Sequence, residues 1–154
     1  MYKLLVTAGL IALNASLTFA LPLQAQAKNQ KSDCTATVAS AQKYIEKGRD
    51  IEVTASISDI SSEYPDHPNN RPYKYVFVLE GKASFAILDS PIFMKIIASK
   101  VINNCNSVSL IVFAVNKTDV YNSIGLMPGG NTEFFKCLKY GEKAKESWGE
   151  EFCH

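Results

Sequence analysis

The chain has 154 residues and carries 16 Lys and Arg against 15 Asp and Glu, which gives a formal net charge of +1. A balance so close to zero argues against a function that depends on binding nucleic acid or an anionic membrane through charge. The length fits one domain, which would bury roughly two-thirds of the surface of its unfolded chain.

The N-terminus has the order of a secretory signal peptide. Lys3 supplies a positive charge, residues 4–13 form an apolar run, and Ala25-Gln26-Ala27 provides the small residues that signal peptidase requires. We therefore expect cleavage after Ala27, which would leave residues 28–154 as a single secreted or periplasmic domain without a permanent membrane anchor. The alternative is an uncleaved anchor, but a membrane span needs about 20 strongly apolar residues, and polar residues and Pro22 interrupt the second half of this segment.

Four cysteines remain after the signal peptide, namely Cys34, Cys105, Cys137 and Cys153. An even number in a secreted chain indicates disulfides. A zinc site would need two cysteines about two to four residues apart, and no such pair is present. Four cysteines allow three pairings, among which we favour Cys34–Cys105 and Cys137–Cys153, because the second pair is the closest in sequence.

The first half of the mature chain predicts one helix, one strand and a long loop. Residues 28–33 are polar and are expected to form a loose tail. Apolar residues at helical spacing predict a helix over 35–47, and strict alternation predicts a half-buried strand over 51–58. Residues 59–72 contain three prolines, which predict a stiff, exposed loop.

The middle of the chain predicts a hairpin followed by a helix. Residues 73–80 and 83–88 resemble two strands joined by Gly81-Lys82, a sequence typical of a type II′ turn. Ser90-Pro91 then begins a helix that is expected to end near Asn103. Its predicted apolar face comprises Ile92, Phe93, Ile96, Ile97, Val101 and Ile102, and its polar stripe comprises Lys95, Ser99 and Asn103.

Three more strands are predicted beyond this helix. Residues 108–115 are almost continuously apolar, which is typical of a central strand. Residues 120–127, interrupted by Gly125, and residues 132–138 follow after short turns, and the tail is polar. Short turns between strands favour antiparallel pairing, so we expect an α+β fold in which an antiparallel sheet of about five to six strands packs against two helices.

Five short segments of the mature chain carry a resemblance to known proteins. They are Asp66-His67-Pro68, Ser90-Pro91-Ile92-Phe93-Met94-Lys95, Ile102-Asn103-Asn104-Cys105, Gly125-Leu126-Met127-Pro128 and Trp148-Gly149. Together they resemble small secreted cyanobacterial proteins of unassigned function. The resemblance implies a periplasmic or extracellular setting, and it implies no activity, cofactor or catalytic residue.

Candidate chemistry is confined to the proline-rich loop. His67 is the one histidine suited to act as a base, because His154 is the last residue. No Gly-x-Ser-x-Gly motif is present. Glu63, Asp66 and His67 are close enough in sequence to be considered as metal ligands, but the stiff loop favours a locally hydrogen-bonded His67. We therefore assign no catalytic residue, no metal and no cofactor.

The sequence favours a non-enzymatic binding or structural module. Loops on rigid scaffolds often carry function, so the binding candidates are Tyr64, Asp66, His67 and Arg71 in the long loop, together with Trp148. For Trp148 we favour the alternative that a lone tryptophan near a disulfide packs over the edge of the core. A partner would be an extracellular or periplasmic protein or ligand. Two alternatives stay open: a small secreted hydrolase or metal-dependent enzyme that uses His67 and nearby acids, and an inhibitor of a secreted enzyme.

Overall fold

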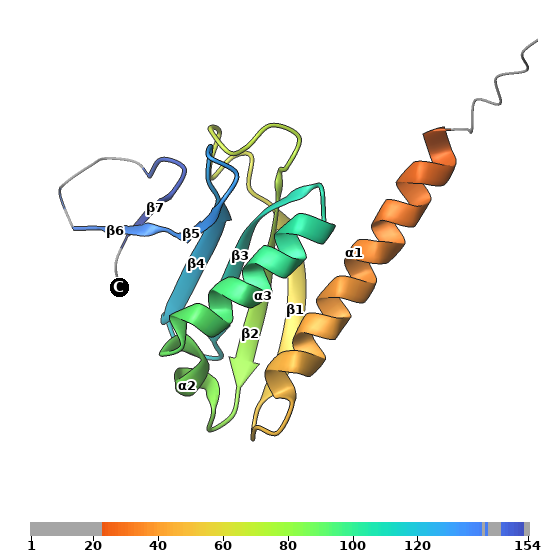
Figure 1. Ribbon diagram of the computed structural model, residues 1–154. Helices are drawn as coiled ribbons and strands as arrows, with labels where there is room; N and C mark the ends of the chain where they lie inside the picture. Colours follow the sequence, from red (N-terminus) through yellow and green to blue (C-terminus); the bar gives the residue numbers. More distant parts are fainter. Residues whose placement is uncertain (1–22, 140, 142–145, 153–154) are drawn as a thin grey trace, which may run out of the picture.

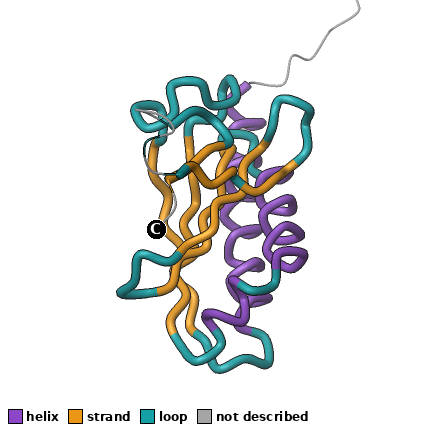
Figure 2. The backbone as a smooth tube through the Cα atoms, turned by 90° about the vertical axis from the view of Figure 1, so that its left-hand side faces the viewer, coloured by secondary structure: helices purple, strands orange, loops and turns teal. Residues whose placement is uncertain are grey.

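The protein forms a layered α+β structure in which helices cover one face of a mostly antiparallel sheet (Figures 1 and 2). The computed structural model describes residues 23–139, 141 and 146–152, and the side chains from residue 33 onward. The predicted signal peptide therefore lies largely outside the described residues. Within the described part of the chain, none of the helices has the length and hydropathy to span a bilayer.

The first helix, α1 (Leu23–Glu46), is longer than the sequence predicted. Residues 28–33, which were expected to be a loose tail, are helical and continuous with the predicted helix. Helix α1 then packs along helix α3 (Pro91–Asn104) and strand β1 (Glu52–Asp59) through Val38, Ala41 and Ile45, which are buried at helical spacing.

The main sheet has five strands in the order β1-β2-β3-β4-β5. Strands β2 (Tyr73–Glu80), β3 (Val108–Val115), β4 (Tyr121–Leu126) and β5 (Thr132–Phe134) follow β1 across it. All neighbouring strands pair antiparallel except β2 and β3, which run parallel. Strand β3 is central, as predicted, but the prediction of a wholly antiparallel sheet is wrong at this one pairing.

The parallel pair arises because residues 83–88 are not a strand. They form the short helix α2 (Ser84–Leu88), so the predicted hairpin at Gly81-Lys82 is wrong and the chain crosses over the sheet through α2 and α3. Ser84, Ile87 and Leu88 are buried at helical spacing. The Ser84 hydroxyl donates a hydrogen bond to the Gly81 carbonyl, which stabilises the start of this turn.

Helix α3 supplies the centre of the core between the helices and the sheet. Met94, Ile97, Ala98, Val101 and Ile102 are buried there against β3. The predicted apolar face was too broad, because Ile92 is 77% exposed and Ile96 is 58% exposed. The helix shows its other side to β5, where Lys95 forms an ion pair with Glu133 at 2.6 Å.

The predicted third strand over residues 132–138 divides into β5 and β6 (Lys136–Leu138). Strand β6 leaves the main sheet and pairs in parallel with β7 (Glu150–Phe152) in the tail. Gly125 does not break β4, which continues through it. A second, smaller core of Ile60, Tyr64, Leu110 and Phe135, with Trp148 packed against it, lies on the face of the sheet opposite the helices.

A disulfide joins Cys34 of α1 to Cys105 at the end of α3, as predicted. Cys137 is also disulfide-bonded. Its predicted partner, Cys153, lies outside the described residues, so that pairing stays a prediction.

Gly125 is required for the second core, because a Cβ atom built there would lie 2.4 Å from Cε1 of Phe135. We expect Gly125→Ala to lower the free energy of unfolding by about 1–3 kcal/mol through overpacking. Gly129→Ala is the matched control, because its Cβ would meet nothing closer than 3.5 Å. Chemical denaturation monitored by circular dichroism compares the two variants, and an equal loss in both would contradict the packing argument.

Candidate functional site

The long loop between β1 and β2 binds the C-terminal segment instead of extending into solvent. Tyr64 was expected to be an exposed anchor, but it is 3% exposed. Its ring makes edge-to-face contacts with Phe135 and Trp148, at centroid distances of 5.5 and 5.6 Å. Its hydroxyl donates a hydrogen bond to the Glu150 carbonyl at 3.2 Å. The loop thus contributes an aromatic side chain to the second core.

Asp66 and Trp148 are also brought together. The backbone N–H of Trp148 donates to Oδ2 of Asp66 at 3.0 Å, and its indole N–H donates to the Leu126 carbonyl at 2.9 Å. Both polar groups of this lone tryptophan are therefore used to hold the C-terminal segment against the loop and β4. The structure places Tyr64, Asp66 and Trp148 in one cluster, where their contacts are structural.

His67 lies outside this cluster and bonds within its own loop. Its Nδ1 is 2.8 Å from the Pro68 carbonyl, which can only accept, so Nδ1 carries the proton. In the neutral ring Nε2 is then an acceptor, and it lies 3.4 Å from Oγ of Ser61. The Ser61 backbone N–H donates to Asp59, and this hydrogen bond lowers the pKa of that carboxyl group.

Arg71 points the other way, beneath the end of α3. Its Nη1 donates to the carbonyls of Ile102 at 3.0 Å and Val108 at 2.8 Å. Helix C-termini leave carbonyls without intrahelical partners, and a cation is favourable there. Partial burial lowers the pKa of the guanidinium. Arg71 is thus a C-terminal cap for α3 beside the disulfide.

A hollow of about 250 Å³ lies on the face of the sheet opposite the helices. Alternate residues of β2, β3 and β4 form its floor, and the long loop and C-terminal segment form its walls. Its lining residues are Glu63, Tyr64, Lys74, Val76, Leu110, Val112, Ala114, Tyr121, Ser123, Glu146 and Glu151. Of the residues that sequence reasoning proposed for binding, Tyr64 is the one that lines it.

Among the described residues that line the hollow, three carboxylates, Glu63, Glu146 and Glu151, lie beside one ammonium group, Lys74. Lys74 Nζ lies 2.6 Å from Oε2 of Glu63, and this pair is partly shielded from water. Glu146 and Glu151 approach from the C-terminal segment. Burial, followed by these carboxylates, raises the pKa of the Tyr64 phenol well above its ordinary value of 10.0.

Tyr121 on β4 shows the same effect. Burial raises the pKa of its phenol, and Glu151 and Glu146 raise it further. Both tyrosines therefore stay neutral and retain a hydroxyl proton. Since carboxylates accept hydrogen bonds and phenols both donate and accept them, the hollow can bind a small cation that also carries polar groups.

The described residues bring together no candidate metal centre. Among them, no group of three or more His, Cys, Asp or Glu side chains is arranged to hold a metal ion, so Glu63, Asp66 and His67 do not converge on one. No protein-family model matches the chain, and neither the curated proteins nor the solved structures that were compared with it contain a match.

Sequence reasoning did not identify Lys74, Tyr121, Glu146 or Glu151 as site residues. Strand β2 carried part of the signal, because Lys74 is a charged residue within a largely apolar strand. The sequence did not point to Glu146 or Glu151, because a polar C-terminal segment does not show which face of the sheet it packs against.

Arg71 provides a test of the structural role assigned to a predicted binding residue. We expect Arg71→Met to lower the free energy of unfolding by about 1–3 kcal/mol, because the carbonyls beneath α3 lose their donor. Arg49→Met is the matched control, since Arg49 donates to the Ile45 carbonyl at the end of α1 but is exposed. Urea denaturation should show the smaller loss for Arg49→Met, and no loss for Arg71→Met would refute the capping role.

Proposed function

We propose that the protein is a non-enzymatic binding module that acts outside the cytosol and holds a small cationic ligand in the hollow on its sheet face. The observation that carries this proposal is the convergence of Glu63, Glu146 and Glu151 on a concave surface whose described lining includes one ammonium group, that of Lys74. Carboxylates in a partly shielded site attract a cation more strongly than the same groups do in open water.

The size and lining of the hollow favour a small organic cation. Its volume lies just below the usual range of small-molecule sites, about 300–1,000 Å³. Val76, Val112 and Ala114 provide apolar contacts on the floor. A ligand with a primary amine or a quaternary ammonium group would pair with the carboxylates, and a short carbon skeleton would contact the apolar floor.

The extracytoplasmic setting is supported by the sequence and by the disulfide. The N-terminal signal pattern predicts export, and disulfides such as Cys34–Cys105 persist in oxidising compartments. The bacterial setting implied by the cyanobacterial resemblance belongs to this same proposal.

A second candidate function is hydrolysis with Ser61 as nucleophile and His67 as base. The observation in its favour is the alignment of Ser61 Oγ, His67 Nε2 and the Pro68 carbonyl, which orients the ring as a third group does in catalytic triads. Against it, Ser61 is exposed, and its own N–H is bound to Asp59 instead of being free to stabilise an oxyanion. The binding function therefore has the stronger support.

Calorimetric titration with choline, putrescine and lysine methyl ester, and with succinate as an anionic comparison, tests the binding proposal. We expect at least one of the cations to bind, succinate to give no heat, and added salt to weaken the binding. Glu146→Gln and Glu151→Gln should each weaken it about tenfold, which corresponds to 1.4 kcal/mol.

Glu133→Gln is the matched control, because Glu133 pairs with Lys95 on the helix side of the sheet. It should leave the affinity unchanged. Binding that is unaffected by the Glu146 and Glu151 variants would place the site elsewhere, and a preference for succinate would contradict the assigned charge. Ester hydrolysis that Ser61→Ala abolishes would favour the second function.

A further inference from the structure

The outer face of the helical layer carries an uncovered apolar strip. Tyr44 on α1 is 53% exposed, and Ile92 and Ile96 on α3 are 77% and 58% exposed. Tyr44 stacks on Phe93 with ring centroids 5.6 Å apart, and Ile92 and Ile96 lie one turn apart on the same helix. The strip is therefore continuous across both helices, and contiguous exposed apolar surface of this kind often marks an interaction site.

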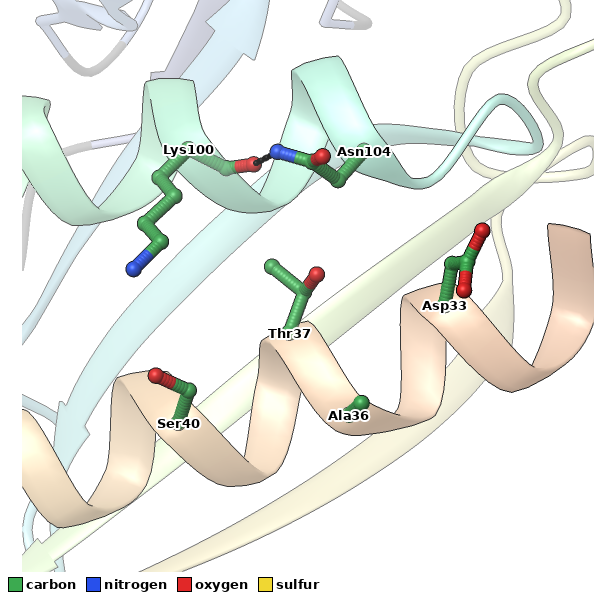
Figure 3. A pocket seen from close by; sticks show the side chains of 6 residues that line it. All are labelled: Asp33, Ala36, Thr37, Ser40, Lys100 and Asn104. Carbon is green, nitrogen blue, oxygen red and sulfur yellow. Dashed lines mark hydrogen bonds between the residues drawn. The ribbon is translucent and has the colours of Figure 1, made fainter.

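A groove of about 360 Å³ continues from this strip toward the disulfide. Figure 3 shows its lining: Asp33, Ala36, Thr37 and Ser40 on α1 lie across from Lys100 and Asn104 on α3. The side chains of Ala36, Thr37 and Ser40 are short, so the groove has room for a large side chain. The apolar strip thus places a large side chain near the C-terminal end of α1, and the groove leaves space near the middle of the same helix.

The charged side chains of α1 also differ between the two sides of Ser40. Asp33 lies on this face near the disulfide. Lys47 follows the C-terminal end of α1 at helical spacing from Asp33, and its N–H still bonds to the Lys43 carbonyl. Both are exposed. Asp33 and Lys47 are each seven residues from Ser40, and Ala36 and Tyr44 are each four residues from it.

We propose that this face is a two-fold interface with a second copy of the chain. With the two α1 helices antiparallel and crossing at Ser40, each Tyr44 meets the groove beside Ala36 of the partner subunit, and each Asp33 lies opposite Lys47 of the partner subunit. A two-fold axis requires one surface to be complementary to itself. About Ser40, the large side chain of Tyr44 is placed opposite the space beside Ala36, and the acidic Asp33 is placed opposite the basic Lys47. The surface is therefore complementary to itself.

The helical layer is the outermost layer on its side of the sheet, so two copies can approach face to face (Figure 2). The stretch from Asp33 to Lys47 is about 21 Å long. With two helices from each copy, the buried area is on the order of 1,200 Å², which is at the lower end of specific interfaces. A dimer of this size should dissociate on dilution.

Sedimentation velocity over a range of concentrations tests this interface on oxidised protein expressed from the full-length gene. We expect a monomer–dimer equilibrium for the wild type and a dissociation constant at least tenfold higher for Tyr44→Asp. Ile57→Asp is the matched control, since Ile57 is 52% exposed but lies on β1, and it should dimerise like the wild type. A monomeric wild type, or equal effects of the two variants, would overturn the proposal.

Charge reversal tests the antiparallel register itself. Asp33→Lys places two lysines opposite each other, and Lys47→Asp places two aspartates opposite each other, so each should weaken the dimer. The double variant exchanges the charges and should restore the wild-type dissociation constant. Because both residues are exposed, the fold should tolerate all three variants. Losses that simply add in the double variant would overturn the register.

Discussion

The structure depends on one constraint, which is that its central sheet is apolar on both faces. Strand β3 directs Ile111 and Phe113 into the core beneath the helices, and Leu110 into the second core on the opposite face. A sheet of this kind is stable only when both faces are covered. Helices α1 and α3 cover one face, and the long loop and C-terminal segment cover part of the other.

The long loop and the C-terminal segment, which cover this other face of the sheet, form the candidate site. Trp148 packs against Tyr64 and Phe135 in the space left by Gly125. Its backbone N–H donates a hydrogen bond to Asp66, which holds the segment beside the loop. Among the described residues, those of β2, β3 and β4 beside this cover form the floor of the hollow. Glu146 and Glu151 reach that hollow because the segment that carries them is fixed by the aromatic cluster.

Patterns among neighbouring residues correctly predicted the helices and strands that those residues determine. The apolar run of β3 and the Ser-Pro start of α3 identified those elements, and the even cysteine count led to the Cys34–Cys105 disulfide. The exposed side of α3 was missed, because a helix with apolar residues on most of its surface does not show which of them face a partner. Ile92 and Ile96 are the residues affected.

The errors have a common physical origin in non-local contacts. Residues 83–88 are equally compatible with a strand and a helix, and the choice of helix is what makes β2 and β3 parallel. Tyr64 resembled an exposed recognition residue, because its contact with Trp148 joins positions 84 residues apart. A single sequence does not reveal a contact of that kind, and the candidate site is built from such contacts.

Trp148 is the only tryptophan, so its fluorescence reports on the C-terminal cover alone. The most direct test of this account compares urea unfolding followed by Trp148 fluorescence with unfolding followed by far-ultraviolet circular dichroism. If the cover is an integral layer of the fold, the two signals give one coincident transition. A fluorescence change at lower urea, with the dichroism still native, would show that the sheet face does not need this cover and would contradict the account.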